Sequence, residues 1–410
     1  MTFNPFSPFF ARTLSALLLM ALLLAGQGAR PAYAASYVVT SLLDNNTSGD
    51  GQCTLREAIQ EANNGADTPD CLGFPSSGDD TIIFLVSGTI TLSFPLTIVS
   101  GAGALTLDGI GRSITISGGG SVRVMRVNSG ADLTLRNLTI ANGNAGAGLF
   151  GGGVLNDGTL TIANSIFSQN TANDGGGVYN NGAVTITNST FFANSANNNG
   201  GGVANFGMLT ITNSAFSGNS ATGSGGGVVN SGPATITNST FSGNSANRFG
   251  GGVSNGGGTL TITNSTFSGN SATLAFGGGG VSNGGTATLK NTIIANSTNG
   301  GNCSGTFAAG STNNMATDAT CGPSFTQVTS AQLNLGSLTG SPAYFPLLAG
   351  SFAVDAGDNA TCADPNTVNN QSQNGVIRPQ DGNGDGNAVC DIGSYEAPST
   401  HFIFLPLITK

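Results

Sequence analysis

Charged residues are scarce in this chain, which has one histidine and no tryptophan. Only 8% of its 410 residues are Asp, Glu, Lys or Arg, and the net charge is −9. Such a chain has no basic stripe for phosphate groups, so neither nucleic acid nor an anionic membrane surface is an expected partner. The lack of tryptophan argues against propeller blades, which usually carry it. With His401 as the sole histidine, a Cys–His catalytic pair is hard to build.

Apolar runs are also short, and none reaches the roughly 20 residues that a transmembrane helix needs. The longest, Leu14–Ala25, follows Arg12 and precedes the small-x-small pattern Ala32-Tyr33-Ala34. This order of features is typical of a secretory signal, so we expect residues 1–34 to be a signal peptide cleaved after Ala34. An uncleaved membrane anchor is the alternative. Cleavage removes two arginines and no acidic residue, which makes the net charge −11.

The cysteines agree with export, because they are even in number and fall into three local couples around a long cysteine-free centre. The suggested pairs are Cys53–Cys71, Cys303–Cys321 and Cys362–Cys390. Local pairing is the simplest interpretation, although six cysteines allow 15 connectivities and the sequence alone does not choose among them.

A repeat occupies the middle of the chain. The tetrapeptide Gly-Gly-Gly-Val recurs in steps of 24, 25, 25, 25 and 28 residues. Its valines are Val154, Val178, Val203, Val228, Val253 and Val281. An asparagine follows each valine by two, at Asn156, Asn180, Asn205, Asn230, Asn255 and Asn283. A fixed period of this length indicates a solenoid.

Apolar residues recur at fixed phases of this repeat. One column is Ile162, Ile186, Ile211, Ile236, Ile262 and Leu289, and another is Phe167, Phe191, Phe216, Phe241, Phe267 and Ile293. Alternation with period two around them indicates short strands. Copies stacked about 4.8 Å apart bury these columns together with the valines. We therefore predict an all-β chain with a right-handed parallel β-helix over residues 81–300, of which 151–300 hold the regular repeats.

Asparagine forms two further columns, which we place at the bends between strands. They are Asn164, Asn188, Asn213, Asn238, Asn264 and Asn291, and then Asn170, Asn194, Asn219, Asn244, Asn270 and Asn296. Asparagine tolerates the left-handed backbone that a bend needs. Stacked side-chain amides can also bond to one another along a row.

Residues 35–80 are predicted to cap the N-terminal end. Thr54-Leu55-Arg56-Glu57 is a capping box, and the apolar residues Leu55, Ala58, Ile59 and Ala62 lie on one face of the short helix that it starts. A solenoid needs such a plug because an open terminal strand invites aggregation. Less regular strands from Thr81 to Arg136 complete about nine turns, or a rod on the order of 45 Å long.

Both ends of the mature chain resemble known modules. Cys53-Thr54-Leu55-Arg56-Glu57-Ala58 resembles the CSLREA module of secreted bacterial surface proteins, with Thr in place of its Ser. The Gly-Gly-Gly-Val and Phe-x-x-Asn elements resemble the repeats of polymorphic outer-membrane proteins, which are β-helical surface adhesins, although we do not expect that family's translocator barrel in the residues that follow the last repeat. Ala353–Asp358, Arg378-Pro379 and Cys390–Glu396 resemble the choice-of-anchor domain.

The resemblance implies a protein held at a bacterial cell surface. We accordingly expect residues 301–397 to be a C-terminal cap of the choice-of-anchor type. Residues 398–410 hold the apolar run Phe402–Ile408, which is too short to span a membrane. We interpret this tail as a sorting or anchoring signal, with an ordinary packing strand as the alternative.

Parallel β-helices of the pectin-lyase-like type often cleave acidic polysaccharides, so an enzyme is the main alternative function. From Asn137 to Asn296 the charged residues are Asp157, Asp174, Arg248 and Lys290. Arg136 and Lys290 share one outward column but lie six turns apart, or roughly 29 Å, which is too far for one active site.

The early turns are where an acid–base cluster would have to form. They hold Asp108, Arg123, Arg126, Asp132 and Arg136. We expect Asp108 and Arg136 to form a surface ion pair. Clustering of Asp108, Asp132, Arg126 and Arg136 in one groove would favour a polysaccharide lyase or hydrolase.

One segment is a candidate calcium site. In Asp381-Gly382-Asn383-Gly384-Asp385-Gly386 oxygen ligands stand at positions 1, 3 and 5 with glycine at 6, as in an EF-hand loop. Position 12 is Ile392 rather than Glu, although Asp391 adjoins it. Calcium held by Asp381, Asn383, Asp385 and Asp391 is therefore one interpretation, and a plain run of Asx-turns is the other.

Pairs of threonines alternate with the buried isoleucine column and are expected to point outward. They are Thr185 and Thr187, Thr210 and Thr212, Thr235 and Thr237, and Thr261 and Thr263. Stacked, they resemble the Thr-x-Thr faces of β-helical ice-binding proteins, although threonine also simply suits exposed strand positions.

Our main prediction is a non-catalytic structural or adhesive scaffold, secreted to the cell surface, whose partner is an extracellular glycan or protein.

Overall fold

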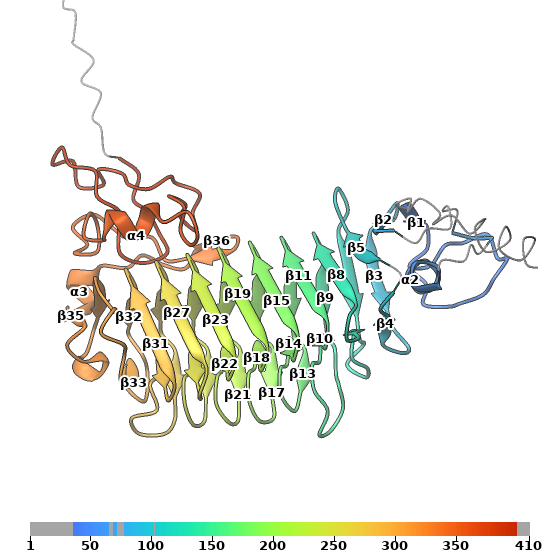
Figure 1. Cartoon of the computed structure of the whole chain (residues 1–410), viewed down its shortest axis with the longest axis horizontal. Coiled ribbons are helices and arrows are strands. Elements are labelled where there is room, and N and C mark those ends of the chain that lie inside the picture. The colour runs from blue at the N-terminus through green and yellow to red at the C-terminus, as the bar shows by residue number, and fades with distance from the viewer. Residues whose placement is uncertain (1–35, 65–68, 72–77, 102, 400–410) are drawn as a thin grey trace, which may run out of the picture.

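A computed structural model describes residues 36–64, 69–71, 78–101 and 103–399. The predicted signal peptide and the apolar run of the tail lie outside the described residues. The described part is a rod of stacked parallel strands, with a short helix at the N-terminal end and irregular C-terminal segments beside the last turns (Figure 1). No helix among the described residues is long and apolar enough to cross a membrane.

Three long sheets and one short one form the sides of the rod. The ten-stranded sheet contains β1 (Ser36–Val39), β2 (Asp80–Phe84), β5 (Ala104–Asp108), β8 (Asp132–Arg136), β11 (Thr159–Ala163), β15 (Ala183–Thr187), β19 (Met208–Thr212), β23 (Pro233–Thr237), β27 (Thr259–Thr263) and β31 (Thr286–Lys290). The nine-stranded sheet contains β4 (Leu96–Ile98), β7 (Met125–Val127), β10 (Val154–Asn156), β14 (Val178–Asn180), β18 (Val203–Asn205), β22 (Val228–Asn230), β26 (Val253–Asn255), β30 (Val281–Asn283) and β33 (Cys303–Gly305).

The other two sheets follow the same order along the rod. The eleven-stranded sheet contains β3 (Gly88–Thr91), β6 (Ile114–Ser117), β9 (Thr139–Ala141), β12 (Ile166–Ser168), β16 (Thr190–Phe192), β20 (Ala215–Ser217), β24 (Thr240–Ser242), β28 (Thr266–Ser268), β32 (Ile293–Ala295), β34 (Asn314–Ala316) and β35 (Phe325–Gln327). The five-stranded sheet contains β13 (Thr171–Ala172), β17 (Ser195–Ala196), β21 (Ser220–Ala221), β25 (Ser245–Ala246) and β29 (Ser271–Ala272).

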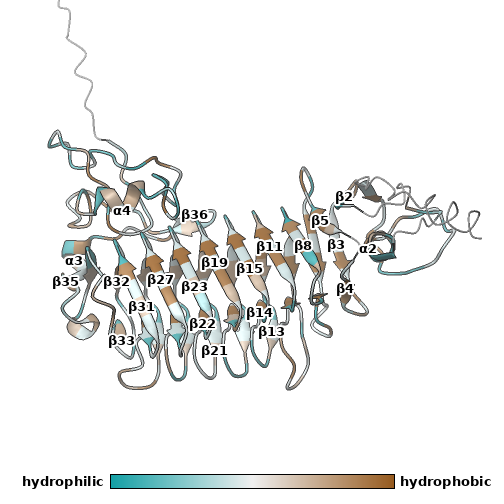
Figure 2. Ribbon diagram, viewed as in Figure 1, coloured by the Kyte–Doolittle hydropathy of each residue, from teal (hydrophilic) through white to brown (hydrophobic). Residues whose placement is uncertain are grey.

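The structure confirms the predicted parallel β-helix, because equivalent residues of successive copies are direct partners in the ladder. Ile186 pairs with Ile211, and Ile211 pairs with Ile236. The buried phenylalanine rings stack with centroids 4.6–4.8 Å apart from Phe167 to Phe267. In Figure 2 apolar residues recur at the same level in successive strands of the ten-stranded sheet. The columns thus form one continuous core.

One member of the phenylalanine column was assigned wrongly from the sequence. Phe267 pairs with Ile294 rather than with Ile293, which pairs with Thr266 and faces outward. The error has a simple cause. Residues 293 and 294 are both isoleucine, so only their spacing from the preceding Asn291 shows which of them continues the phenylalanine column. Ile293 packs instead against the C-terminal residues Leu347 and Ile392.

The asparagine columns divide into bends and hydrogen-bonded ladders. The column from Asn164 to Asn291 is left-handed, with φ between 46° and 50°, as predicted. In the second column the side-chain amides bond along the row from Asn170 to Asn270, each at 2.9 Å. Asn296 is not part of it, because Ser297 occupies that position and its N–H donates to Asn302. The asparagines that follow the valines form another amide ladder, from Asn156 to Asn283.

The predicted capping box starts helix α2 (Leu55–Asn64) at the N-terminal end. The backbone N–H of Thr54 donates to the Glu57 carboxylate at 3.0 Å, and the N–H of Glu57 donates to the Thr54 hydroxyl at 3.2 Å. The predicted apolar face of α2 is buried, and the Cys53–Cys71 disulfide adjoins it. The strand ladder is longer than residues 81–300, since β1 pairs with β2 at one end and β33, β34 and β35 continue it at the other.

The chain then turns back along the side of the rod. It includes η1 (Ala319–Cys321), α3 (Ser330–Leu333), β36 (Thr339–Gly340), β37 (Ala343–Tyr344) and α4 (Asn359–Ala363). We call residues 339–399 the C-terminal lobe; it lies against the outer face of the last turns (Figure 1). The Thr240 hydroxyl donates to Gln373 at 2.6 Å, and the N–H of Ser394 donates to the Thr266 hydroxyl at 3.0 Å. These contacts dock the lobe on the eleven-stranded sheet.

Candidate binding surface

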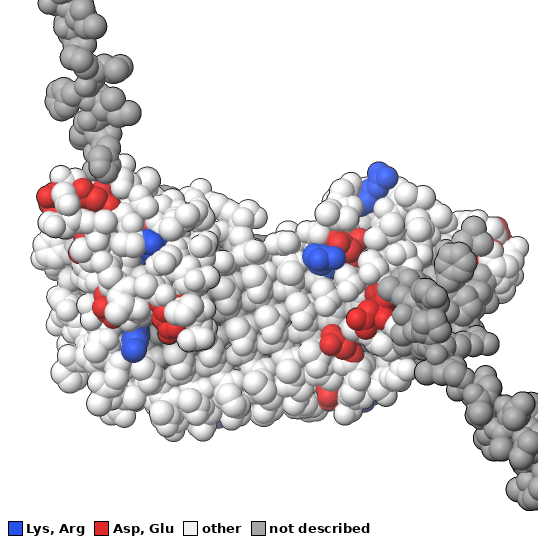
Figure 3. Space-filling model, turned by 45° about the horizontal axis from the view of Figure 1, so that its top comes forward, with Lys and Arg blue, Asp and Glu red and all other residues white. Residues whose placement is uncertain are grey.

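Charged side chains gather toward the two ends of the rod, and the turns between them present an uncharged surface (Figure 3). In this view the surface is hollowed between the C-terminal lobe and the early turns. On the face that this view shows, the surface of the middle turns is therefore uncharged.

The predicted ion pair between Asp108 and Arg136 is confirmed. The two residues are partners on β5 and β8, and Arg136 Nε lies 2.9 Å from Asp108 Oδ2. Asn137 Nδ2 donates to the other carboxylate oxygen at 2.7 Å. A shallow pocket of about 460 Å³ lies close by, between the loop of residues 109–114 and residues 137–139, Asn164 and Ile166. The Asp108 carboxylate is thus occupied by structural partners.

The other charged residues of the early turns lie elsewhere. Arg126 projects from β7 of the nine-stranded sheet and contacts Asp157 at 3.4 Å. Arg123 donates to the carbonyl oxygens of Phe150 and Gly151, and burial lowers the pKa of its guanidinium. Arg126 and Arg136 therefore stand on two different sheets.

Asp132 stands apart from Arg136 on the same strand. It opens β8, four residues before Arg136, which corresponds to about 13 Å along a strand. Burial raises its pKa, and the charge of Asp79 adds to the shift. Asp108 and Arg136 meet, but Asp132 and Arg126 do not join them in one groove.

Arg136 and Lys290 share one outward column, as predicted. Between them the column reads Ala163, Thr187, Thr212, Thr237 and Thr263. Beside Lys290 a pocket of about 430 Å³ separates the ten-stranded sheet from α4, and Asp358 and Asp364 line its other wall. The hydrogen bond from the Thr361 hydroxyl, more than any other contact, lowers the pKa of Asp358.

The expected double threonine array is shorter than predicted. Thr237 and Thr263 are 2% and 3% exposed, because the C-terminal lobe covers them. Neighbouring Asn238 and Asn264 are buried as well, with Asn238 Nδ2 donating to the Gln371 carbonyl at 3.1 Å. The prediction from strand alternation placed these threonines correctly on the outer face but missed the segment that packs on it. A two-column flat array remains only over Thr185 with Thr187 and Thr210 with Thr212.

The candidate calcium loop is folded on itself. The Asp381 carboxylate accepts the backbone N–H groups of Gly384, Asp385 and Gly386, at 2.8, 3.1 and 3.0 Å. Asn383 accepts from the N–H of Asp385, and Asp385 from that of Asn387. These are Asx-turns, the other interpretation of the motif.

The fourth predicted ligand lies in the interior of the lobe. Asp391 is 1% exposed, and its oxygens accept the N–H groups of Asp355 and Ala397 at 2.8 and 2.6 Å. Among the described residues no group of three or more His, Cys, Asp or Glu side chains is placed to hold a metal ion. Calcium binding by Asp381, Asn383 and Asp385 stays a prediction, and Asp391 would have to leave its present partners to join them.

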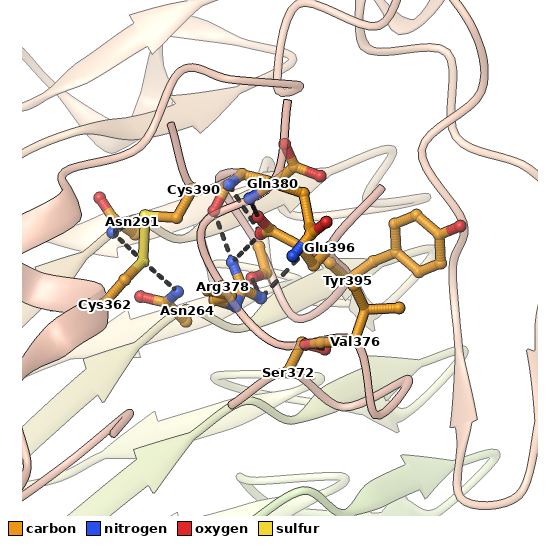
Figure 4. A network of polar contacts seen from close by, with 12 residues as sticks. Asn264, Asn291, Cys362, Ser372, Val376, Arg378, Gln380, Cys390, Tyr395 and Glu396 are labelled. Carbon is orange, nitrogen blue, oxygen red and sulfur yellow. Dashed lines mark hydrogen bonds and ion pairs between the residues drawn. A yellow bond between two sulfur atoms is a disulfide. The ribbon is translucent and has the colours of Figure 1, made fainter. Parts of the chain in front are cut away.

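A buried arginine organises the interior of the lobe (Figure 4). Arg378 is 1% exposed, and its Nη1 lies 3.1 Å from Glu396 Oε2. Its guanidinium also donates to the carbonyl oxygens of Gln371, Asp391, Gly393 and Tyr395. Burial lowers the pKa of Arg378, whereas the charges of Glu396 and Asp391 act in the opposite direction. Each N–H that faces a carbonyl offsets part of the cost of burying the charge.

The three predicted disulfides are confirmed. Cys53–Cys71, Cys303–Cys321 and Cys362–Cys390 are bonded, and there are no free cysteines. The last of them lies where the lobe meets the rod. Asn264 Nδ2 lies 3.1 Å from Cys362 Sγ, and Asn291 Nδ2 lies 3.4 Å from the same sulfur (Figure 4).

Asp391 links the stability of the lobe to pH. Burial, and after it the Glu396 carboxylate, raise the pKa of Asp391 from 3.8 to about 7. Between these values the folded state holds a proton that the unfolded state has released, so the free energy of unfolding falls as pH rises from about 4 to about 7. We expect the lobe to melt at a lower temperature at about pH 8 than at about pH 5.5.

Asp391→Asn tests this assignment, because asparagine does not ionise. The variant should keep only the pH dependence that Glu396 contributes, whose pKa burial also raises. Thermal melts followed by near-ultraviolet circular dichroism of Tyr344 and Tyr395, whose rings contact each other at 5.6 Å in the lobe, provide the measurement. A wild-type melting temperature that is equal at the two pH values would contradict the assignment.

Comparison with known proteins adds little to this description. No family model and no curated protein sequence matches the chain. Among solved structures, the chain is similar to Jun a 1, the major allergen from cedar pollen, with 14% sequence identity and a TM-score of 0.40 over 83% of this chain and 88% of that one. The assignment of the fold rests on the strand ladder itself.

Proposed function

We propose that this protein is a secreted scaffold displayed at a bacterial cell surface, where it serves a structural or adhesive role toward an extracellular glycan or protein. The observation that carries the proposal is the neutral, in-register surface of the middle turns. In the row of Thr185, Thr210, Thr235 and Thr261, every side chain stands directly over its equivalent in the next turn. Such a surface suits extended contact rather than the concentration of reactive groups at one point.

The placement of the early charged residues also supports a scaffold. A polysaccharide lyase or hydrolase needs its acid and base within a few Å of one reacting atom. Asp108 instead bonds to Arg136 and Asn137, and Arg126, on another sheet, pairs with Asp157. Two partnered pairs on different faces do not converge on a common substrate atom.

Sequence resemblance supports the location. The CSLREA-like segment contains Cys53 of the Cys53–Cys71 disulfide and starts the capping helix. Arg378 and Glu396, from the segments that resemble the choice-of-anchor domain, pair inside the C-terminal lobe. Three disulfides fit a protein of an oxidising, extracellular compartment.

Two assays on the exported protein test the proposal. Brief protease treatment of intact cells is expected to remove the protein, which would place it at the outer surface. Incubation of the purified protein with a panel of neutral and acidic polysaccharides is expected to release no reducing ends. Sugar release that disappears in Asp108→Ala would replace the scaffold with an enzyme, and protection from protease on intact cells would contradict surface display.

A further inference from the structure

Three aromatic side chains form a row on the outside of the nine-stranded sheet. The ring of Phe150 stacks on that of Tyr179 with centroids 4.6 Å apart, and Tyr179 contacts Phe206 at 5.2 Å with a tilt of 36°. The side chains of Phe150 and Phe206 are 37% and 47% exposed. Tyr179 projects from β14, where its ladder partners are Leu155 and Ala204. The rings therefore lie along the axis of the rod as one accessible apolar strip.

A polar groove continues the same surface toward the N-terminal end. Its volume is about 640 Å³, and it is lined by Thr97, Arg126, Asn128, Ser129, Asp157 and Asn181. Arg126 is the ladder partner of Leu155, so it stands in the outward column of Tyr179 two strands away, or about 10 Å. The aromatic strip and the groove are thus parts of one surface, which runs along the rod.

The charges of this groove are balanced. Arg126 contacts Asp157 at 3.4 Å, and Asn181 Nδ2 donates to the other oxygen of the same carboxylate at 2.8 Å. The groups that remain available to a ligand are amides, hydroxyls and the Arg126–Asp157 ion pair. These groups donate to and accept from hydroxyl groups without selecting a charged ligand. The net charge of −9 further disfavours a polyanion.

We propose that the strip of Phe150, Tyr179 and Phe206 and the adjoining groove bind a neutral polysaccharide chain. Sugar rings combine C–H patches, which pack against aromatic side chains, with hydroxyl groups, which the groove residues can bond. The site extends along the axis of the rod, as a chain-like ligand requires. This inference rests on the proposed adhesive function and names the class of its ligand.

A peptide fits this surface less well. Strand addition needs a free sheet edge, and the backbone of β14 already bonds to β10 on one side and to β18 on the other. A peptide would therefore have only side-chain contacts here. Binding of a protein instead of a glycan is one outcome that the experiment below can reveal.

Single substitutions that the ladder already accepts test the proposal. Tyr179→Ala places in β14 the residue that its partner Ala204 supplies in β18, and Phe206→Ser places the residue that Ser231 supplies one turn later. Phe192→Ala is the matched control, because Phe192 is a similarly exposed phenylalanine on the eleven-stranded sheet. Far-ultraviolet circular dichroism checks that each full-length variant keeps the fold.

The probes are cellohexaose and laminarihexaose, which are neutral, with polygalacturonic acid as the charged comparison. Calorimetric titration is expected to show that the wild-type protein binds a neutral probe, that Tyr179→Ala and Phe206→Ser each weaken binding at least about tenfold, and that Phe192→Ala leaves it unchanged. Binding should also be insensitive to added salt, because no net charge is neutralised.

Several outcomes would overturn the proposal: no binding of either neutral probe, binding that survives both substitutions, or binding confined to polygalacturonic acid and weakened by salt. Selective recovery of a protein that competes at this strip would overturn it too. None of these results bears on protease accessibility at the cell surface, so the scaffold function stands or falls separately.

Discussion

Phe216→Ala is expected to lower the free energy of unfolding by about 3–5 kcal/mol. Phe216 is fully buried, and its ring lies between those of Phe191 and Phe241, at 4.7 and 4.8 Å. Truncation removes the buried contacts that the ring makes and leaves a cavity between the faces of the two neighbouring phenylalanine rings. The ladder bonds of β20 to both neighbouring strands hold the backbone in place, so the core can close this cavity only in part.

Phe192→Ala provides the matched comparison. Phe192 is the last residue of β16, one turn before the strand of Phe216. It has the same side chain as Phe216, but it points outward and is 50% exposed. Its truncation should change the free energy of unfolding by no more than about 0.5 kcal/mol. Guanidinium chloride unfolding, followed by far-ultraviolet circular dichroism, measures both variants. Equal midpoints for the two would mean that the phenylalanine column is not the core of the repeats.

Arg378→Met is expected to destabilise the C-terminal lobe by about 3–5 kcal/mol. Glu396 and Asp391 would remain in the interior of the lobe without the guanidinium, and the carbonyl oxygens of Gln371, Gly393 and Tyr395 would lose a donor. A buried charge or acceptor without a partner costs far more than the pair itself contributes. Methionine fills much of the volume, so loss of packing is a minor part of the effect.

The lobe and the rod should respond differently to this substitution. Limited proteolysis of Arg378→Met is expected to cut within residues 339–399 while the strand ladder keeps its far-ultraviolet signal. Arg136→Met is the control, because that arginine also has a carboxylate partner but its side chain is 46% exposed. An exposed pair contributes about 1 kcal/mol or less. If the two variants lose the same stability, or if the lobe of Arg378→Met resists protease like the wild type, the buried network does not hold the lobe.

The fold could be predicted from the sequence because the residues of each repeat fix its register against the next. The step of 25 residues places Ile186, Ile211 and Ile236 in one column, and stacking is the arrangement that buries them all. Left-handed asparagines and the capping box were readable for the same reason, since each is a local requirement of the backbone. The phase failed in the last repeat, at Ile293, where adjacent isoleucines give no contrast, and at Asn296, whose predicted position Ser297 occupies.

The surface could be predicted only in part, because it depends on a segment without periodicity. Alternation along a strand shows that Thr237 and Thr263 point outward, but it does not show that the lobe covers them. The lobe docks through residues such as Gln373 and Ser394, whose spacing in the sequence carries no sign of their partners in the rod. The aromatic strip was also missed, since Phe150 and Phe206 lie outside the regular strands and outside the repeating columns.

The most direct test of the account is a cross-link between neighbouring turns. Thr185 and Thr210 are exposed ladder partners, so strands about 4.8 Å apart should bring cysteines at these positions within the Cα separation of a direct disulfide, which a mild oxidant then forms. Thr185 and Thr235 lie two turns apart, or about 10 Å, which is too far for a direct disulfide. We predict rapid cross-linking in Thr185→Cys/Thr210→Cys and almost none in Thr185→Cys/Thr235→Cys, as read by mass spectrometry of the peptides. Equal yields in the two, or none in the first, would contradict the stacking of equivalent residues.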